Sequence, residues 1–218
     1  FPVLDMTVEG CVFRRCGRFA AVNQQDDGNT ISPVTTGIHR NRVYNCGAGG
    51  FDVETATSLP PTYCEYSFNQ VIDSGDDDWT YGWGISFGLH SYGTAIGNRV
   101  VNYAKNSTSG TAGLVGFNAF EVGGPTSFVQ NVATGGKSAG LLCQRSLGAQ
   151  WMIEVVGGQY KDNRTHGIFV LNYAYVSITG ADVEANGING ILFSGSANPK
   201  VVGGRVRSNS ADTPNTHS

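Results

Sequence analysis

The ten-residue stretch Ile38-His-Arg-Asn-Arg-Val-Tyr-Asn-Cys-Gly47 decides the fold, because the chain repeats its pattern. Seven other blocks align with it without an internal gap: residues 8–17, 66–75, 95–104, 127–136, 155–164, 178–187 and 201–210. The sixth position of each block is apolar: Phe13, Val43, Val71, Val100, Val132, Tyr160, Val183 and Val206. Repeats of about 20–50 residues indicate stacked units that share one continuous core.

A second apolar segment follows seven of the eight blocks. In it a small residue or arginine precedes a bulky apolar residue, namely Phe19, Phe51, Ile85, Leu114, Leu141, Ile168 and Ile191. Within the blocks apolar residues alternate with polar or small ones, which is the pattern of strands. The last three sixth positions, 160, 183 and 206, are 23 residues apart, which leaves room for three short strands and their turns. The sequence therefore predicts an all-β fold, a parallel β-helix of about seven to eight coils with three parallel sheets.

The fourth position of the block carries the most specific signal. It holds Cys11, Asn41, Asn69, Asn98, Gln130, Gly158, Ala181 and Gly204. A side-chain amide both donates and accepts, so successive amides can bond one another from coil to coil as an internal ladder. Asparagine and glycine also tolerate the left-handed conformation that a tight bend requires.

The runs Asn41-Arg-Val-Tyr-Asn-Cys-Gly, Asn69-Gln-Val-Ile-Asp-Ser-Gly and Asn98-Arg-Val-Val-Asn-Tyr-Ala resemble the coil motif of the pectin-lyase-like superfamily of right-handed parallel β-helix proteins. The resemblance covers residues 8–210. It implies that the ladder lies between the second and third sheets and that the segments from Phe51 onward form the first sheet. In that family polysaccharide binds along the first sheet, between walls made by the flanking loops. Four insertions are expected to build these walls: residues 23–36, 55–63, 75–83 and 103–112.

Length and composition exclude several other classes. The 218 residues suit a single domain over 1–218, and both ends look truncated, as in a fragment of a longer β-helix. Glycine supplies 31 residues, and apolar residues make up 40%, which is too much for disorder. The net charge of −3 argues against a nucleic-acid partner. No apolar run is long enough to span a membrane.

The five cysteines, Cys11, Cys16, Cys46, Cys64 and Cys143, lack metal-binding spacing. Cys16 and Cys46 share a repeat position, so they are expected to stack one coil apart. We interpret the cysteines as free, mostly buried thiols, and a disulfide remains an alternative.

The strand from Phe51 offers a candidate catalytic pair. Val53 is expected to point inward with Phe87, so Asp52 and Glu54 point outward, with Ser86 and Gly88 above them. Carboxylates at positions i and i+2 of one strand lie roughly 6–7 Å apart along the chain. That separation suits an acid and a base for glycosidic cleavage, or a Ca²⁺ site if the substrate is a uronate. Otherwise no cofactor is predicted, and a polar surface strand of no catalytic role is the simpler alternative.

The insertion Asp76-Asp77-Asp78-Trp79-Thr80-Tyr81-Gly82-Trp83 combines acids with aromatic rings. Sugars present apolar C–H faces and hydroxyl rims, which aromatic platforms and carboxylates bind. We expect Asp78 to join the catalytic residues and the others to contact substrate: Asp76, Asp77, Trp79, Tyr81 and Trp83. A solvated acidic turn over packed aromatic residues is the alternative.

Four further residues are candidates because of their place in the coil. His90 follows the first-sheet strand as a potential acid or base, and Glu121 lies one coil later. Lys105 and Arg145 could contact uronate or sulfate groups, a role that the resemblance implies because β-helix lyases use Arg or Lys.

The outward positions of the later coils are apolar: Val115, Leu142, Phe169 and Leu192. Such a row is costly to leave in water, so we expect another subunit or another part of the protein to cover it. Phage tailspikes, which the chain also resembles, are trimers of β-helices, which implies a homotrimer.

The sequence thus favours a polysaccharide lyase or glycoside hydrolase, as part of a phage tailspike depolymerase or a secreted polysaccharidase. Its location would be extracellular or the virion surface. There are two alternatives: a non-catalytic structural or receptor-binding shaft, and a polysaccharide epimerase. The same fold hosts these two classes as well as lyases and hydrolases.

Overall fold

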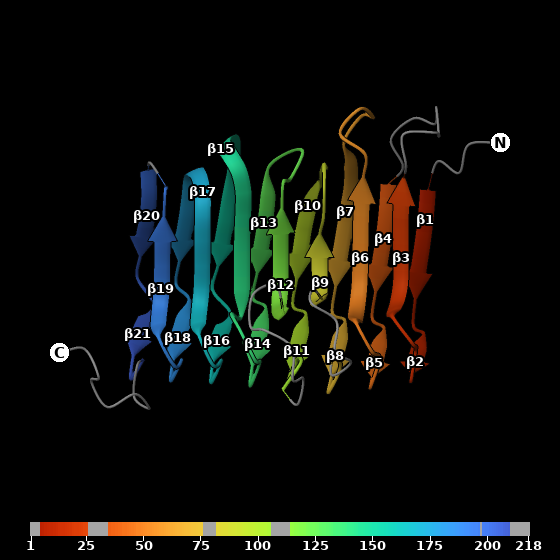
Figure 1. Ribbon diagram of the computed structural model, residues 1–218, viewed down its shortest axis with the longest axis horizontal. Coiled ribbons are helices and arrows are strands. Elements are labelled where there is room, and N and C mark those ends of the chain that lie inside the picture. Colours follow the sequence, from red (N-terminus) through yellow and green to blue (C-terminus); the bar gives the residue numbers. More distant parts are fainter. Residues whose placement is uncertain (1–4, 26–34, 76–81, 106–113, 197, 210–218) are drawn as a thin grey trace.

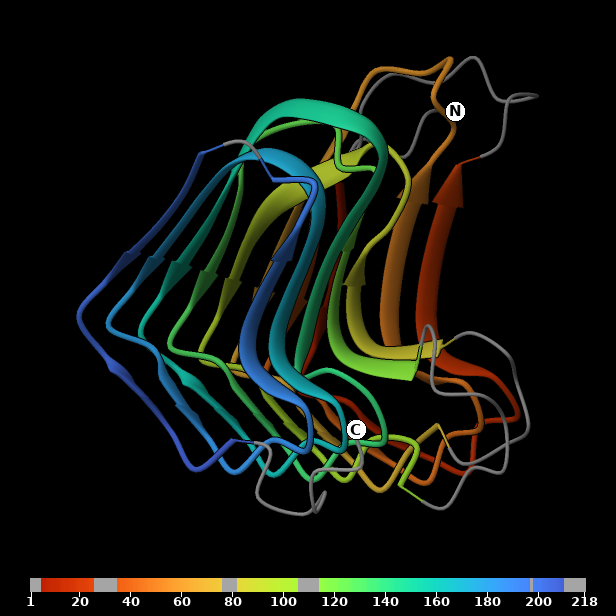
Figure 2. The ribbon, with the colours of Figure 1, turned by 60° about the vertical axis from the view of Figure 1, so that its left-hand side comes forward.

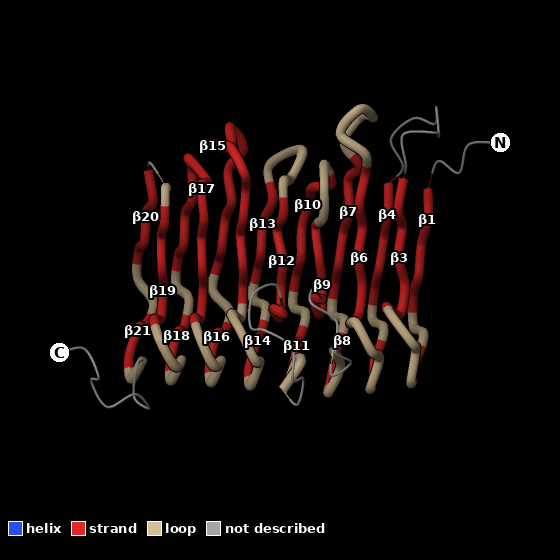
Figure 3. The backbone as a smooth tube through the Cα atoms, in the orientation of Figure 1, coloured by secondary structure: helices blue, strands red, loops and turns tan. Residues whose placement is uncertain are grey.

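The computed structural model describes residues 5–25, 35–75, 82–105, 114–196 and 198–209. All regular structure in these segments is strand, and every strand pairing is parallel. The strands stack along the long axis of the molecule, from β1 at the N-terminal end to β20 and β21 at the C-terminal end (Figure 1). The tube view shows strands linked by short turns (Figure 3). Within the described segments no helix is long and apolar enough to cross a membrane.

The strands form three runs. The first run comprises β3 (Phe19–Gln25), β6 (Gly49–Thr55), β9 (Gly82–Phe87), β12 (Leu114–Phe120), the first parts of β15 (Leu141–Val156) and β17 (His166–Thr179), and β19 (Asn189–Ser194). The second run comprises β1 (Asp5–Glu9), β4 (Thr35–His39), β7 (Thr62–Ser67), β10 (Ser91–Ile96), β13 (Thr126–Val129), the later parts of β15 and β17, and β20 (Asn198–Val202). The third run comprises β2 (Val12–Arg14), β5 (Arg42–Tyr44), β8 (Gln70–Ile72), β11 (Arg99–Val101), β14 (Val132–Thr134), β16 (Gln159–Lys161), β18 (Asp182–Glu184) and β21 (Arg205–Arg207).

The parallel β-helix is confirmed, with one difference in its sheets. The described strands form two hydrogen-bonded sheets, of 13 and 8 strands, where three sheets were predicted. The first and second runs belong to one sheet because β15 and β17 continue around the corner from one run into the other. Figure 2 shows this curved corner at the top of the coils.

The core is a stack of side chains that point into the coil. Ile38, Val43 and Val71 are fully buried. Aromatic rings pack edge to face at the centre, with ring centroids 5.0 Å apart for Tyr66 and Phe87 and 5.7 Å apart for Phe87 and Phe128. Edge-to-face pairs add about 0.5–1.5 kcal/mol beyond the burial of their area.

The amide ladder is confirmed for Asn41, Asn69 and Asn98, but its fourth member is Asn131 and not Gln130. Asn69 Nδ2 donates to Asn98 Oδ1 at 3.0 Å, and Asn98 Nδ2 donates to Asn131 Oδ1 at 3.1 Å. Gln130 is exposed on the left-handed bend just before this position. The ladder ends at Gly158, where a Cβ would lie 2.4 Å from the backbone oxygen of Asn131.

The predicted register was wrong by one residue in this fifth block. Val100 pairs with Ala133, so Ala133 and not Val132 is the buried sixth-position residue. The sequence analysis also placed Phe19 and Leu114 at the position of Phe51 in their coils, and this was wrong. The residues equivalent to Phe51 are Ala21 and Phe117, and the inward residue of that fourth coil is Ala119 where Gly116 was predicted.

A second ladder, which the sequence analysis missed, lies at the turn after the third run. Asn163 Nδ2 donates to Asn186 Oδ1 at 3.0 Å, and Asn186 Nδ2 donates to Asn209 Oδ1 at 2.9 Å. In the first coils Cys16 and Cys46 hold the same position, and the Cys16 N–H lies 3.3 Å from Cys46 Sγ. The predicted stacking of these two cysteines is confirmed, and all five cysteines are free thiols.

A column of glycines lets the first run approach the third. It consists of Gly50, Gly84, Gly116, Gly140, Gly167 and Gly190. A Cβ at Gly84 would lie 2.6 Å from Val100 Cγ1 and 2.7 Å from the Gly116 oxygen. The small residue before each bulky apolar one is therefore a packing requirement.

Candidate functional site

A polar row occupies the outward face of the first run. Asp52 on β6, Ser86 on β9 and Asn118 on β12 lie in register on neighbouring strands. Asn118 Nδ2 donates to Ser86 Oγ at 3.2 Å. All three side chains are buried although they point away from the core. The first run therefore has a covered polar patch on its outer surface, which is where the sequence placed the substrate groove.

Asp52 is only 4% exposed, and its Oδ1 atom has no hydrogen-bond partner among the described residues. Burial raises the pKa of this carboxyl well above its usual value, and the negative charge of Glu54 raises it further. Ser86 acts in the opposite direction because its hydroxyl stabilises the charged form. The geometry thus favours a neutral carboxylic acid at position 52.

Glu54 lies two residues further along β6, on the same outward side. A Cβ on Gly88 would lie 2.5 Å from Glu54 Cγ, so the Glu54 side chain lies against the glycine of the next coil. The predicted neighbours Ser86 and Gly88 are therefore confirmed as the residues beside Asp52 and Glu54. Glu54 is half-buried, and its charge remains the largest electrostatic influence on Asp52 after burial itself.

The core directly supports this site. The hydroxyl of the fully buried Tyr66 donates to the backbone oxygen of Ser86 at 2.5 Å. Burial raises the pKa of Tyr66 well above its usual value, so the phenol stays a neutral donor. A rigid backbone at Ser86 fixes the position of the side chain that faces Asp52.

Trp83 belongs to the same site. Its ring stacks on Phe19, with centroids 5.9 Å apart and an interplanar angle of 27°. Its indole N–H lowers the pKa of Asp52, although the buried Nε1 makes no well-aligned hydrogen bond within the described segments. Asp52 Oδ1 and Trp83 Nε1 are thus neighbouring buried polar atoms without a well-aligned hydrogen bond among the described residues, and such atoms call for an explanation such as an ordered water or a catalytic role. The other residues predicted in this insertion lie outside the described residues: Asp76, Asp77, Asp78, Trp79 and Tyr81.

Three predicted residues come together at the corner between the first and second runs. The His90 N–H donates to the Glu121 backbone oxygen at 2.9 Å, and both residues have left-handed φ angles, 55° and 52°. Arg145 Nε lies 3.6 Å from Glu121 Oε2, which is an ion contact rather than a hydrogen bond. Arg145 thus contacts a carboxylate of its own chain. The buried Nδ1 of His90 has no hydrogen-bond partner within the described segments.

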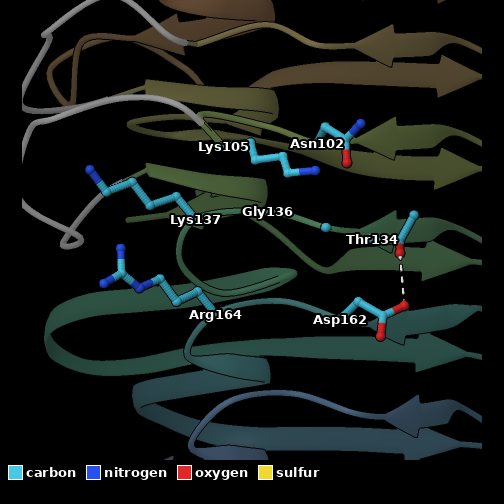
Figure 4. Close-up of a pocket in the computed structure, with 8 residues that line it drawn as sticks. Asn102, Lys105, Thr134, Gly136, Lys137, Asp162 and Arg164 are labelled. Carbon is cyan, nitrogen blue, oxygen red and sulfur yellow. Dashed lines mark hydrogen bonds between the residues drawn. The ribbon is translucent and has the colours of Figure 1, made fainter. Parts of the chain in front are cut away.

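Lys105 lies away from the carboxyl pair, at the turn between the third and first runs. It lines a cavity of about 430 Å³ together with Asn102, Thr134, Gly135, Gly136, Lys137, Asp162 and Arg164 (Figure 4). The four predicted groove walls can be judged only in part, because residues 26–34, 76–81 and 106–113 lie outside the described segments. The loop between β6 and β7 is described, and it turns at Leu59, whose N–H donates to the Ala56 oxygen at 2.9 Å.

The apolar half of the outward face begins next to the polar row. Leu142, Phe169 and Leu192 continue the row after Asn118, whereas Val115 pairs with Trp83. Val115 and Leu142 are already buried against Ala139, Trp83 and Phe169 within one chain. A cavity of about 410 Å³ lies here, lined by Val115, Ser138, Ala139, Leu142, Gln144, Thr165, His166, Phe169, Leu171 and Ile188. The homotrimer through this face stays a prediction, and Phe169 and Leu192 are the residues left partly open for it.

The described residues contain no group of three or more His, Cys, Asp or Glu that could hold a metal ion. Asn118 is the site residue that sequence reasoning missed. The sequence does contain a sign of Asn118, because Asn118 follows the apolar Phe117 in the same way that Asp52 follows Phe51. The slip of register at Leu114 concealed that signal.

Comparison with known proteins supports the fold. No family model and no curated protein matches the chain. Similar solved structures include two from Azotobacter vinelandii. The A-module of mannuronan C-5 epimerase AlgE4 matches with a TM-score of 0.59 and 20% sequence identity. The match covers 94% of this chain and 57% of the AlgE4 module. The A-module of AlgE6 has a TM-score of 0.56 and 19% identity, with 94% and 58% covered. The chain therefore spans a little over half the length of each of these modules.

Proposed function

We propose that this protein is an enzyme that cleaves glycosidic bonds of a polysaccharide, with Asp52 as the acid and Glu54 as the base. One observation carries the proposal. A buried carboxyl with a raised pKa lies beside a second carboxyl on the outward face of the first run. Pairs of carboxyls whose surroundings separate their pKa values are the usual source of acid and base in glycosidic cleavage.

Each member of the pair has a role that follows from its surroundings. The oxygen of a breaking glycosidic bond needs a proton, and a neutral Asp52 can donate one at a pH at which an ordinary aspartate is ionised. Glu54 is half-buried, and as a carboxylate it can accept a proton from water in hydrolysis or from a ring C–H in elimination. His90, whose Nδ1 has no hydrogen-bond partner among the described residues, is a further candidate for proton transfer at the adjoining corner.

The rest of the outward face suits a sugar chain. The stacked Phe19 and Trp83 rings offer apolar contact for C–H faces. Ser86 and Asn118 are buried and support the polar row through their own hydrogen bond. The adjoining cavity of about 410 Å³ is of the size of sites for small molecules. A polymeric substrate of this kind favours an extracellular setting.

Epimerisation is a second candidate, favoured by the names of the two similar structures, both mannuronan C-5 epimerase modules. The same pair could act on one ring carbon: a base removes the proton from one face and an acid returns a proton to the other. No bond of the polymer backbone would then break. Calcium would be expected only if the uronate carboxylate needs a cation.

The reaction classes are separated by incubating the protein with acidic and neutral polysaccharides and reading three products. New reducing ends without unsaturation indicate hydrolysis, and unsaturated ends with ultraviolet absorbance indicate elimination. Incorporation of solvent deuterium at a ring carbon without chain scission indicates epimerisation. Binding without any product would contradict the proposal and favour a non-catalytic shaft.

A further inference from the structure

Two of the thiols lie in register at the turn that leads from the third run to the first. Cys16 follows the end of β2 in the same way that Cys46 follows the end of β5, and these two strands pair in parallel. The Cys16 N–H donates to Cys46 Sγ at 3.3 Å, and the Gly47 N–H donates to the Cys16 oxygen at 2.8 Å. The two cysteines are therefore stacked on neighbouring coils.

The spacing of this pair suits a disulfide bond. Neighbouring strands lie about 4.8 Å apart, and the Cα atoms of bonded cysteines usually lie about 4.4–6.8 Å apart. Cys46 belongs to the main core cluster and Cys16 packs against that cluster, so both side chains point inward. The pKa of the Cys46 thiol is raised to about 11, mainly by burial and next by a hydrogen bond with the Cys16 thiol. The two sulfur atoms thus already lie within hydrogen-bonding reach.

The thiols differ in their access to solvent, and this difference orders any reaction with an external disulfide. Cys16 is half-buried, whereas Cys46 is buried, so a reagent reaches Cys16 first. Cys64 and Cys143 are fully buried, and burial raises the pKa of both thiols well above the usual value. Cys11 is exposed, but the residue stacked on it is an asparagine of the amide ladder. Among the described residues, Cys16 and Cys46 are therefore the pair placed to join.

We propose that Cys16 and Cys46 form an intrachain disulfide in an oxidising environment, with a small-molecule disulfide such as oxidised glutathione as the oxidant. The Cys16 thiolate attacks one sulfur of glutathione disulfide, and one glutathione thiolate leaves. The Cys46 thiol gives its proton to solvent and attacks Cys16 Sγ, which displaces the second glutathione. Two electrons pass from the cysteine pair to the oxidant, which ends as two molecules of reduced glutathione.

The bond would connect two strands of the first run. Cys16 lies shortly before β3, which begins at Phe19, and Cys46 lies shortly before β6, which carries Asp52. Phe19 stacks on Trp83 at the carboxyl site. The cross-link would therefore fix the turns that lead into both strands. This inference holds whether or not Asp52 acts as an acid.

The test incubates the folded protein with oxidised glutathione at about pH 8.5, near the ordinary pKa of a thiol. The remaining thiols are then alkylated in denaturant, and the peptides are analysed by mass spectrometry. We expect a cross-linked peptide that joins residues 16 and 46 in most molecules, glutathione on Cys11, and alkylated Cys64 and Cys143. The midpoint of thermal unfolding is expected to rise by at least about 3 °C and to return on reduction.

Cys46→Ser is the matched variant, because the next coil already has a serine at this turn position. Ser74 Oγ there accepts from the Cys46 N–H at 3.2 Å. The variant is expected to fold, to keep glutathione on Cys16 and to form no cross-link. Cys11→Ser removes the exposed thiol and is expected to cross-link like the wild type.

Wild-type protein that keeps glutathione on Cys16 without joining it to Cys46 would overturn the inference. A bond between any other two cysteines of the folded chain would also overturn it. A complete cross-link between residues 16 and 46 with an unchanged midpoint of unfolding would show that the bond does not fix the two turns, and would contradict that part of the proposal.

Discussion

Asp52 and Ser86 occupy paired positions on the neighbouring strands β6 and β9, and both side chains are buried on the outward face of the sheet. An outward position on a β-helix normally meets solvent, so a buried carboxyl there costs stability when it is ionised. The pKa of Asp52 is raised mainly by this burial. The pH dependence of stability therefore reports on the environment of Asp52.

Wild-type stability is expected to fall, relative to that of Asp52→Asn, as the pH rises above about 4, the ordinary pKa of aspartate. Below that pH the carboxyl is neutral in both the folded and the unfolded chain, so the contribution of Asp52 to the free energy of unfolding is fully present. Above it the unfolded chain ionises Asp52 while the folded chain does not, and the contribution is lost as the pH passes through the folded pKa. Urea unfolding of both proteins across this range provides the measurement, and parallel stability curves would show that Asp52 is not in a raised-pKa site.

The amide ladder predicts a sharp contrast between two adjacent amides. Asn131 Nδ2 donates to the Ala95 oxygen at 2.8 Å, and Asn131 Oδ1 accepts from the Asn98 backbone at 2.9 Å. Asn131→Ala leaves these buried partners unsatisfied and is expected to cost about 3 kcal/mol or more. Gln130→Ala, at the exposed neighbouring position, is expected to cost less than about 0.5 kcal/mol. Equal losses in the free energy of unfolding would contradict the register described above.

The glycine column predicts a second contrast. Gly84→Ala places a Cβ against Val100 Cγ1 and the Gly116 oxygen, and backbone oxygen cannot move aside as a flexible side chain can. The expected cost is about 1–3 kcal/mol, as for other overpacked sites. Gly17→Ala is the control, because a Cβ there meets nothing within 4 Å. It is expected to be neutral or to stabilise by up to about 1 kcal/mol. A thermal unfolding comparison that ranks Gly17→Ala as the more harmful change would refute this packing.

Much of the fold could be predicted because buried amides and apolar residues recur at one position in each coil. Asn41, Asn69 and Asn98 identify that position without ambiguity. The fifth block failed because Gln130 and Asn131 are both amides and Val132 and Ala133 are both apolar. Alternation with a period of two does not distinguish the two registers when adjacent residues are of the same type. A slip of one residue then turns every side chain to the other face of the strand.

The site was predictable to a smaller extent. The outward direction of Asp52 followed from the alternation of β6, but its burial did not, because burial depends on what covers the sheet. The pairing of Glu121 with Arg145 joins residues of adjacent coils whose separation in sequence gives no sign of contact. Lys105 was expected near the groove, yet it lines a cavity with Lys137 and Arg164, two cations that drew no attention in the sequence.

The most direct test of the central claim is the turnover of a polysaccharide by the wild type and by Asp52→Asn, at a pH at which the wild type is folded and active. The replacement keeps the shape of the side chain but cannot donate the acid proton. We expect a fall in kcat of at least about 100-fold, with polymer binding retained. Glu65→Gln, a partly exposed acid on β7, serves as the control and is expected to turn over substrate at the wild-type rate. Turnover by Asp52→Asn within about twofold of the wild type would contradict the assignment of Asp52 as the acid.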